Sequence, residues 1–337
     1  MVFVMTRDPA IDRRAFLALL GLGALASPPA ARAQQAGKVP VVGVLTSGIG
    51  PRASTTDATR QGLRELGYVE GQTIAFDVRF AGGKPETFPG LAAGLVQQKV
   101  DVLLAIGAAA LKAARDATGT IPIVAVDLES DPVQAGFARS LAQPGGNITG
   151  FFLDQPGLTG KWLELIREAV PGTRRIAVLV DMTTGPWQLA AIKAAALKLK
   201  IELQFLEIRS SGELDRALGA GVKGGSRALV QLSSPLFGSP SLAKQIAEFT
   251  VKHRLPAISF SRRFAEAGGL MAYGPNPAEH EKRLAVYIDK ILKGAKPADL
   301  PIEQPTKFDF VLNLKTAKAT GLALPQSLVA RADQVIQ

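Results

Sequence analysis

The sequence predicts an α/β protein of two lobes, each a doubly wound parallel β-sheet, joined by three chain crossings that form a hinge. Apolar, β-branched runs alternate with helical patterns along most of the chain, which is typical of parallel strands joined by right-handed crossover helices. The alternation restarts near residue 153. About 300 residues follow the amino-terminal segment, and single cores rarely exceed about 250–300 residues, so two lobes are expected.

Residues 1–33 have the organisation of a secretory signal peptide and resemble a twin-arginine export signal. Arg13-Arg14 precedes an apolar stretch over residues 15–26, and the small-residue site at 31–33 predicts cleavage after Ala33. This apolar stretch is too short to span a bilayer. Asp12 stands where such signals usually carry Ser or Thr, so the Sec route stays open beside the twin-arginine route.

The chain contains no cysteine. An exported protein without cysteine has neither disulfides nor a lipid-anchored Cys, so the mature chain is expected to be free in the periplasm. Thiolate catalysis and Cys metal sites are excluded. His253 and His280 are the only histidines, which argues against histidine-based zinc sites and Ser–His catalysis.

The chain is basic, with a formal net charge of +10 at pH 7. Removing residues 1–33, which hold four Arg and two Asp, lowers this charge to +8. Lys and Arg are scattered, without a run of five and without interleaved aromatic residues. This pattern favours an evenly solvated surface and predicts no nucleic-acid partner.

The first half of the mature chain alternates strictly between strands and helices. The expected strands are 39–46, 73–80, 100–106 and 121–126, and the expected helices are 55–66, 86–98 and 107–119.

The stretch from 121 to 153 organises the rest of the chain. The buried strand 121–126 leads into an acidic loop at 127–131, followed by Pro132 and a short helical pattern. Ligand sites in open α/β sheets lie beyond the carboxyl ends of the strands, which is where this acidic loop falls. After a turn at 143–147, the apolar run 148–153 is predicted to leave the first sheet and lead towards the second lobe.

The second half repeats the pattern. The expected strands are 175–180, 201–208, 227–232, 255–260 and a final strand 308–312, and the expected helices are 160–170, 187–199, 213–219, 241–253 and 277–292. The glycine-rich segment 268–275 predicts a return crossing to the first lobe. The expected lobes are 38–152 with about 275–300, and 153–272 with about 303–335.

Six blocks of this chain resemble the periplasmic substrate-binding proteins of ABC importers that group with a tryptophan/tyrosine-binding type. Together they span nearly the whole mature chain. The blocks are 61–72 (QGLRELGYVEGQ), 130–150 (SDPVQAGFARSLAQPGGNITG), 160–179 (GKWLELIREAVPGTRRIAVL), 252–258 (KHRLPAI), 266–275 (EAGGLMAYGP) and 291–322 (ILKGAKPADLPIEQPTKFDFVLNLKTAKATGL).

This resemblance implies a type I periplasmic binding fold that closes around a small solute, such as an aromatic or other amino acid, and performs no chemistry. It implies an ABC permease of the inner membrane as the partner. A monomer without cofactor or metal is expected.

A zwitterionic ligand needs donors for its carboxylate and an acceptor for its ammonium. Backbone N–H groups at helix starts are suitable donors, and Thr46-Ser47 and Gly107-Ala108 are the candidates. The alternative, of equal weight, is that both pairs are ordinary βα turns that do not contact a ligand. Relatives often carry a hydroxyl residue where Ala108 stands, so main chain would have to make that contact.

Asp127 and Asp131 are the candidate ammonium partners. The position of Asp131 before Pro132 favours helix capping, whereas Asp127 remains a candidate for ligand contact. In the second lobe, Asp181 and Ser233-Ser234 follow strands and would face the cleft, with a role as turn residues as the alternative.

Aromatic residues are weaker candidates. Tyr273 lies in the expected hinge, where its ring could stack on a ligand or anchor the crossing strand. Trp187 and Phe237 could cover an aromatic ligand, Trp162 has the helical spacing of a core residue, and His253 suits the end of a helix.

Three other functions remain as alternatives. An exported α/β enzyme is disfavoured because the chain lacks a nucleophile elbow, a Walker loop, a dinucleotide fingerprint and a metal-ligand cluster. A sensory module would share the fold and the site and differ only in its partner. A DNA-binding regulator is disfavoured by the export signal and by the lack of a helix-turn-helix segment before Lys38.

Overall fold

The computed structural model describes residues 38–47, 54–153 and 155–337. The predicted signal peptide lies outside these residues. No helix within the described ranges has the length and apolar character needed to cross a membrane.

Lobe 1 is built on a five-stranded parallel sheet with the strand order β2-β1-β3-β4-β5. Its strands are β1 (Val41–Thr46), β2 (Ala75–Phe80), β3 (Val102–Ile106), β4 (Ile123–Asp127) and β5 (Ile148–Phe152). Its helices are α2 (Ser54–Glu65), α3 (Phe88–Gln97), α4 (Ala108–Ala117) and α10 (Pro277–Leu292).

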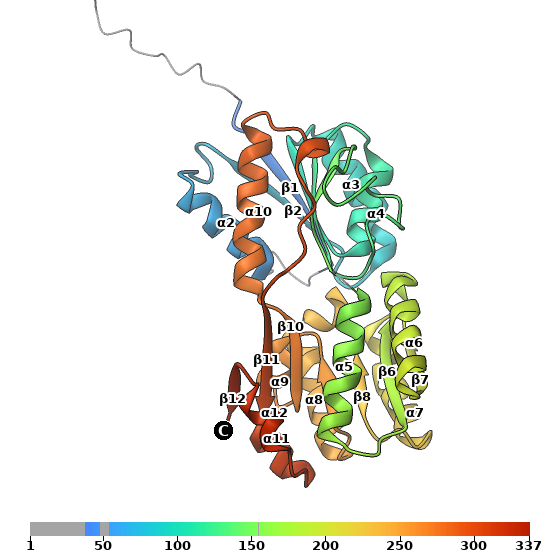
Figure 1. Cartoon of the computed structure of the whole chain (residues 1–337). Coiled ribbons are helices and arrows are strands. Elements are labelled where there is room, and N and C mark those ends of the chain that lie inside the picture. Colours follow the sequence, from blue (N-terminus) through green and yellow to red (C-terminus); the bar gives the residue numbers. More distant parts are fainter. Residues whose placement is uncertain (1–37, 48–53, 154) are drawn as a thin grey trace, which may run out of the picture. The chain divides into compact units, whose positions relative to one another are not determined.

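Helices cover both faces of this sheet (Figure 1). On one face, Val42 and Val44 of β1 pack with Leu63 of α2 and Leu284 of α10. On the other, Leu45 packs with side chains of α3 and α4. Successive strand residues point to opposite faces, so a strand buried on both sides must be apolar along its length, as β3 is and as β1 is up to its last residue, Thr46.

The prediction that the run 148–153 leaves the first sheet is wrong. β5 pairs in parallel with β4, from Ile123 opposite Ile148 to Asp127 opposite Phe152. Phe151 and Phe152 pack into the clusters on opposite faces of the sheet. The run is therefore apolar because it is a strand covered on both sides.

The short helix expected after Pro132 is also wrong. The segment forms turns, in which Ala135 N donates to Asp131 O at 2.9 Å and Phe137 N donates to Pro132 O at 2.8 Å. Gly136 has a positive φ of 71° and ends the helical winding after a single turn.

Lobe 2 is built on a seven-stranded sheet with the order β12-β11-β10-β9-β8-β6-β7. The strands are β6 (Arg175–Asp181), β7 (Glu202–Ile208), β8 (Leu229–Gln231), β9 (Ala257–Ser259), β10 (Met271–Pro275), β11 (Phe308–Asn313) and β12 (Gln334–Ile336). All neighbouring pairs are parallel except β10 and β11, which are antiparallel.

Two expectations for this lobe need correction. The segment 268–275 does not simply return to lobe 1, because β10 is a strand of the second sheet and pairs with both β9 and β11. The strand at 308–312 is not the final one, because β12 follows and pairs with β11. With three residues, β12 is too short to have a readable period.

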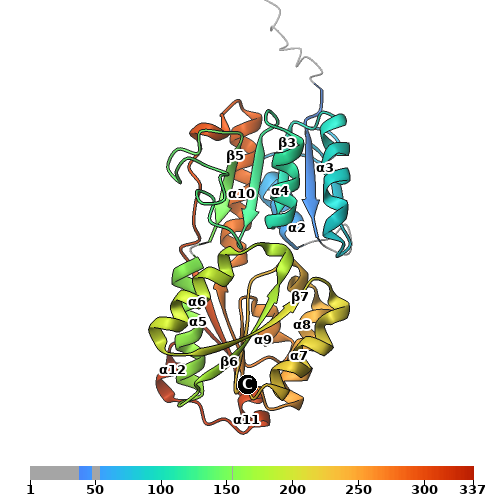
Figure 2. The same cartoon turned by 90° about the vertical axis from the view of Figure 1, so that its right-hand side faces the viewer.

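Helices again form two layers, which Figure 2 shows on either side of β6. They are α5 (Gln155–Ala169), α6 (Trp187–Leu199), α11 (Leu314–Thr320) and α12 (Gln326–Ala330) on one face, and α7 (Leu214–Lys223), α8 (Pro240–Lys252) and α9 (Arg262–Glu266) on the other. The chain passes between the sheets after β5, after β10 and before β11.

Candidate functional site

A cavity of about 490 Å³, here called the main cavity, lies at the carboxyl ends of strands from both sheets. Lobe 1 lines it with Ile106, Gly107, Val126, Leu128 and Glu129, and lobe 2 with residues 231–235, 237–238, 260–263, Glu266, 274–276 and Asp309. A small cavity of about 40 Å³ shares Ile106, Gly107 and Pro235 with it.

Asp127 is fully buried and lines neither cavity. Its Oδ1 accepts hydrogen bonds from the backbone N–H groups of Glu129 and Ser130, both at 3.0 Å. Oδ2 has no hydrogen-bond partner among the described residues. The side chain therefore shapes the loop after β4 and holds Glu129 in place.

Glu129, which the sequence analysis did not select, is the acidic residue of this loop that lines the main cavity. Its Oε2 accepts from Ala108 N at 3.3 Å, and its Oε1 accepts from Ser233 Oγ at 2.8 Å. One carboxyl group thus links the start of α4 in lobe 1 to the loop after β8 in lobe 2. No sequence signal separated Glu129 from its acidic neighbours.

Burial raises the pKa of Glu129 well above its usual range, and the charge of Asp127 raises it further. Burial also raises the pKa of Asp127, whereas the hydrogen bonds that Ser130 and Glu129 provide lower it by a smaller amount. Two adjacent buried carboxyl groups resist double ionisation, so both burial and the charge of Asp127 oppose the ionisation of Glu129.

The predicted donors at Gly107-Ala108 are placed at the cavities, but the Ala108 N–H already donates to Glu129. Gly107 has a φ of 92°, and a Cβ at this position would lie 2.5 Å from Cγ of Pro235. Only glycine fits both this backbone conformation and the close approach of lobe 2.

The two residues of the other candidate turn in lobe 1, Thr46 and Ser47, lie in different places. Ser47 lines the small cavity, whereas Thr46, buried at the end of β1, lines neither cavity.

Asp181 and Ser234 pair with each other. Ser234 Oγ donates to Asp181 Oδ2 at 2.6 Å, and Asp181 Oδ1 accepts from Thr183 N at 2.9 Å. Asp181 lines the small cavity, and Ser234 lines the main cavity. Both also act as caps of short helical turns, as the alternative interpretation expected.

Ser233 lines the main cavity and is held by Gln188 of α6. Ser233 N donates to Gln188 Oε1 at 2.8 Å, and Gln188 Nε2 donates to Ser233 O, also at 2.8 Å. This fixed backbone leaves the Ser233 hydroxyl directed at Glu129.

Tyr273 lines neither cavity. Its ring stacks on Phe308 with a centroid distance of 5.5 Å and an interplanar angle of 13°. Its carbonyl accepts from Trp162 Nε1 at 2.7 Å, and Trp162 is fully buried in the core. The structure thus places Tyr273 in the anchoring role that the sequence left as its alternative.

The remaining sequence candidates take different places. Phe237 is buried and lines the main cavity, whereas Trp187 does not line either cavity. Asp131 Oδ1 accepts from the backbone N–H groups of residues 133 and 134 at 2.9 Å, so it caps the turn that forms where a helix was expected. His253 caps the carboxyl end of α8, with its ring 4.3 Å from that of Phe249.

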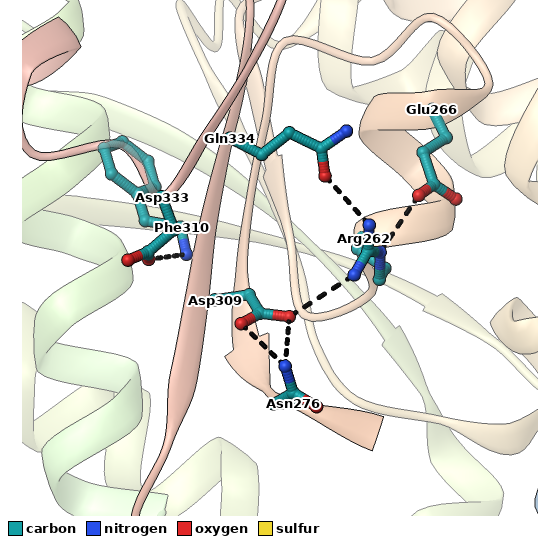
Figure 3. Close-up of polar contacts among 7 residues, drawn as sticks. All are labelled: Arg262, Glu266, Asn276, Asp309, Phe310, Asp333 and Gln334. Atoms are coloured by element: carbon teal, nitrogen blue, oxygen red, sulfur yellow. Dashed lines mark hydrogen bonds and ion pairs between the residues drawn. The ribbon is translucent and has the colours of Figure 1, made fainter. Parts of the chain in front are cut away.

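A polar cluster in lobe 2 was missed by the sequence analysis (Figure 3). Arg262 donates to Glu266 Oε1 at 2.9 Å, to Gln334 Oε1 at 2.8 Å and to Asp309 Oδ2 at 3.5 Å. Asn276 Nδ2 donates to both carboxylate oxygens of Asp309, at 3.0 and 3.1 Å. All of these except Gln334 line the main cavity, and they come from distant parts of the chain.

The described residues contain no group of three His, Cys, Asp or Glu side chains able to hold a metal ion.

Comparison with known proteins identifies the family of this chain. The profile of the family described as "ABC transporter substrate binding protein" matches residues 45–336. The chain is 25% identical over 262 residues to a tyrosine-binding protein of Clostridioides difficile (strain R20291), covering 77% of this chain and 74% of that protein.

Solved structures share the fold. A conserved domain protein from Vibrio cholerae is 27% identical, with a TM-score of 0.80 over 88% of this chain and 100% of that chain. An ABC domain from Streptococcus pneumoniae, solved in complex with L-Trp, is 23% identical, with a TM-score of 0.79 over 89% of this chain and 100% of that chain. The two-lobed α/β fold, the cavity between the sheets and the match over residues 45–336 lead to one conclusion: the chain belongs to the ABC transporter substrate-binding protein family.

Proposed function

We propose that this chain binds an amino acid, with aromatic amino acids first among them, in the main cavity and delivers it to an ABC permease of the inner membrane. The proposal rests on one observation: a cavity of about 490 Å³ lies between two sheets and is lined by both polar and apolar groups. This volume lies within the range of pockets that enclose small molecules. The tyrosine-binding relative and the L-Trp complex support the aromatic choice.

The walls of the cavity suit a ligand with one polar and one apolar part. Ile106, Leu128, Phe237 and Phe260 provide apolar surface, and the polar cluster around Arg262 lies in the same lining. An aromatic side chain against the former and a zwitterionic head group against polar side chains would satisfy both.

We assign the ligand-contacting role to Gly107, Glu129 and Ser233, and a smaller contribution to that cluster. Ser47, Ala108 and Asp181 would act at the small cavity. Asp127, Thr46 and Tyr273 would support these groups from behind.

Delivery requires an open and a closed state, between which the ligand shifts the populations. The three connections between the sheets are the proposed hinge. We further propose that the chain is exported, acts in the periplasm as a monomer and catalyses no reaction.

A thermal-shift screen of the twenty amino acids, small carboxylates and sugars tests the function. A ligand at one hundred times its Kd stabilises by about 2.7 kcal/mol, which corresponds to a rise in Tm of roughly 5–10 °C for a domain of this size. A rise with L-tyrosine or L-tryptophan is expected. A flat response to every amino acid, with a cooperative melt, would contradict the proposed ligand class.

A further inference from the structure

Gln231 is a buried glutamine whose oxygen the chain leaves without a partner. It ends β8, is 2% exposed and lines the main cavity. Its Oε1 is covered by neighbouring atoms and accepts no hydrogen bond from any described residue. A buried carbonyl oxygen without a donor is costly, so such a group in a cavity wall points to a partner from outside the chain.

Gln188 in the same lobe shows how this chain treats a glutamine with a structural role. It is 1% exposed, about as buried as Gln231. Its oxygen accepts from Ser233 N at 2.8 Å, and its nitrogen donates to Ser233 O at 2.8 Å and to Thr184 Oγ1 at 3.2 Å. Every polar atom of Gln188 is used within the fold, and the carboxamide oxygen of Gln231 is not.

Several side-chain donors of the cavity wall are directed at acceptors other than Gln231. Ser233 donates to Glu129, Ser234 to Asp181, and Asn276 to Asp309. Arg262 donates to its three acceptors, and Arg263 Nη1 donates to Gly238 O at 3.0 Å. The wall therefore has an acceptor to offer at Gln231, and its principal donors are already engaged.

We propose that Gln231 reads the amino group of the bound solute, its carboxamide oxygen accepting a hydrogen bond from a ligand N–H. This rests on the proposed function and narrows it to solutes that carry an N–H donor at the lobe 2 wall. Rotation about the last side-chain torsion, which is broad in glutamine, would turn the oxygen out of its covered position. A site built around such a bond rejects analogues that lack the donor, because the buried acceptor then stays unsatisfied.

The binding test compares amino acids with their des-amino analogues. L-Tyrosine is paired with 3-(4-hydroxyphenyl)propanoate, and L-tryptophan with indole-3-propanoate, by calorimetry on the purified chain. Gln231→Met keeps the length of the side chain and removes the carboxamide. We expect it to weaken amino-acid binding about 10- to 100-fold, as for loss of a hydrogen bond to a charged donor, and to leave binding of the analogues nearly unchanged.

A second measurement needs no ligand. Gln231→Met should leave Tm unchanged or raise it, because it removes an acceptor that no residue satisfies. The matched control, Gln188→Met, should lower Tm by at least about 4 °C, because it strips the partners from the buried backbone of Ser233.

Two results would overturn the inference alone. One is a fall in Tm for Gln231→Met as large as that for Gln188→Met, which would make Gln231 structural. The other is equal loss of affinity, or none, for the amino acid and its analogue. Failure of every nitrogen-bearing solute to bind the wild-type chain would overturn the proposed function as well.

Discussion

The polar groups of the two walls of the main cavity differ in burial and in their hydrogen-bond partners. In lobe 1, Glu129 is fully buried, its two oxygens accept hydrogen bonds from Ala108 and Ser233, and its pKa is raised. In lobe 2, Arg262 forms partly exposed ion pairs, and Gln231 keeps a free acceptor. The carboxyl oxygens of Glu129 in the lobe 1 wall thus have hydrogen-bond partners, one of them in lobe 2. The lobe 2 wall still offers an atom to a ligand, so closure and selectivity are assigned to different walls.

Blocking the contact between the walls should have the largest effect. Gly107→Ala places a Cβ at a φ of 92° and 2.5 Å from Pro235. Backbone strain of this kind costs about 1–3 kcal/mol, and the clash adds to it or forces the lobes apart. We expect ligand affinity, measured by calorimetry, to fall at least about tenfold, and small-angle scattering to show a more open chain.

Gly90→Ala is the control for this substitution. Gly90 lies in α3 with open space around it, so alanine there should be neutral or stabilising by roughly 0.5–1 kcal/mol. Equal behaviour of the two variants would show that the contact between Gly107 and Pro235 does not control closure.

The protonation of Glu129 should have the next largest effect. Its folded pKa is raised, so its contribution to stability is complete below its ordinary pKa and is lost as pH rises through the folded value. Each unit of pKa difference corresponds to about 1.4 kcal/mol. Urea unfolding across this range should show the wild-type chain losing free energy of unfolding relative to Glu129→Gln, which keeps the shape and cannot ionise.

Parallel pH profiles for the wild-type chain and Glu129→Gln would refute a raised pKa of Glu129. Asp127→Asn, examined in the same way, separates the two carboxyl groups because Asp127 contacts its own loop and not lobe 2.

Removing the ion pairs of lobe 2 should have the smallest effect. The Arg262 side chain is 37% exposed and its partner Glu266 is 43% exposed, so solvent screens the pairs and each contributes about 0–1 kcal/mol. Arg262→Met should lower the free energy of unfolding by about 1 kcal/mol or less and change affinity only a few-fold. Arg331→Met breaks a pair with Glu168 away from the cavity and should change stability alone.

If Arg262→Met instead abolished binding while Gln231→Met did not, the roles within the lobe 2 wall would have to be exchanged.

The strands and helices that build the lobes were readable because burial on both faces forces apolar, β-branched runs, as in β1, β3 and β4. The path of β5 could not be predicted, because the sequence pattern of an apolar run is the same whether the run stays in its sheet or leaves it. Only pairing with β4, set by tertiary contacts, decides between these outcomes.

The site was predictable at the level of loops and not of side chains. Loops after β3, β4 and β8 line the main cavity, as the strand-end rule requires. Within the loop after β4, however, Asp127 folds back on the backbone and Glu129 faces the cavity, a choice made by local hydrogen bonds. Arg262 and Asp309 meet only because α9 and β11 are brought together by the second sheet.

The packing of α10 on lobe 1 also has a consequence for synthesis. Tyr68, just after α2, donates to Asp289 of α10, a residue 221 positions later in the chain. Until α10 leaves the ribosome, the lobe 1 face formed by Val42 and Val44 lacks its cover of Leu284 and Ile288. The nascent chain therefore carries an uncovered apolar surface through most of its translation, and chaperones that bind such surfaces should engage this lobe until the helix arrives.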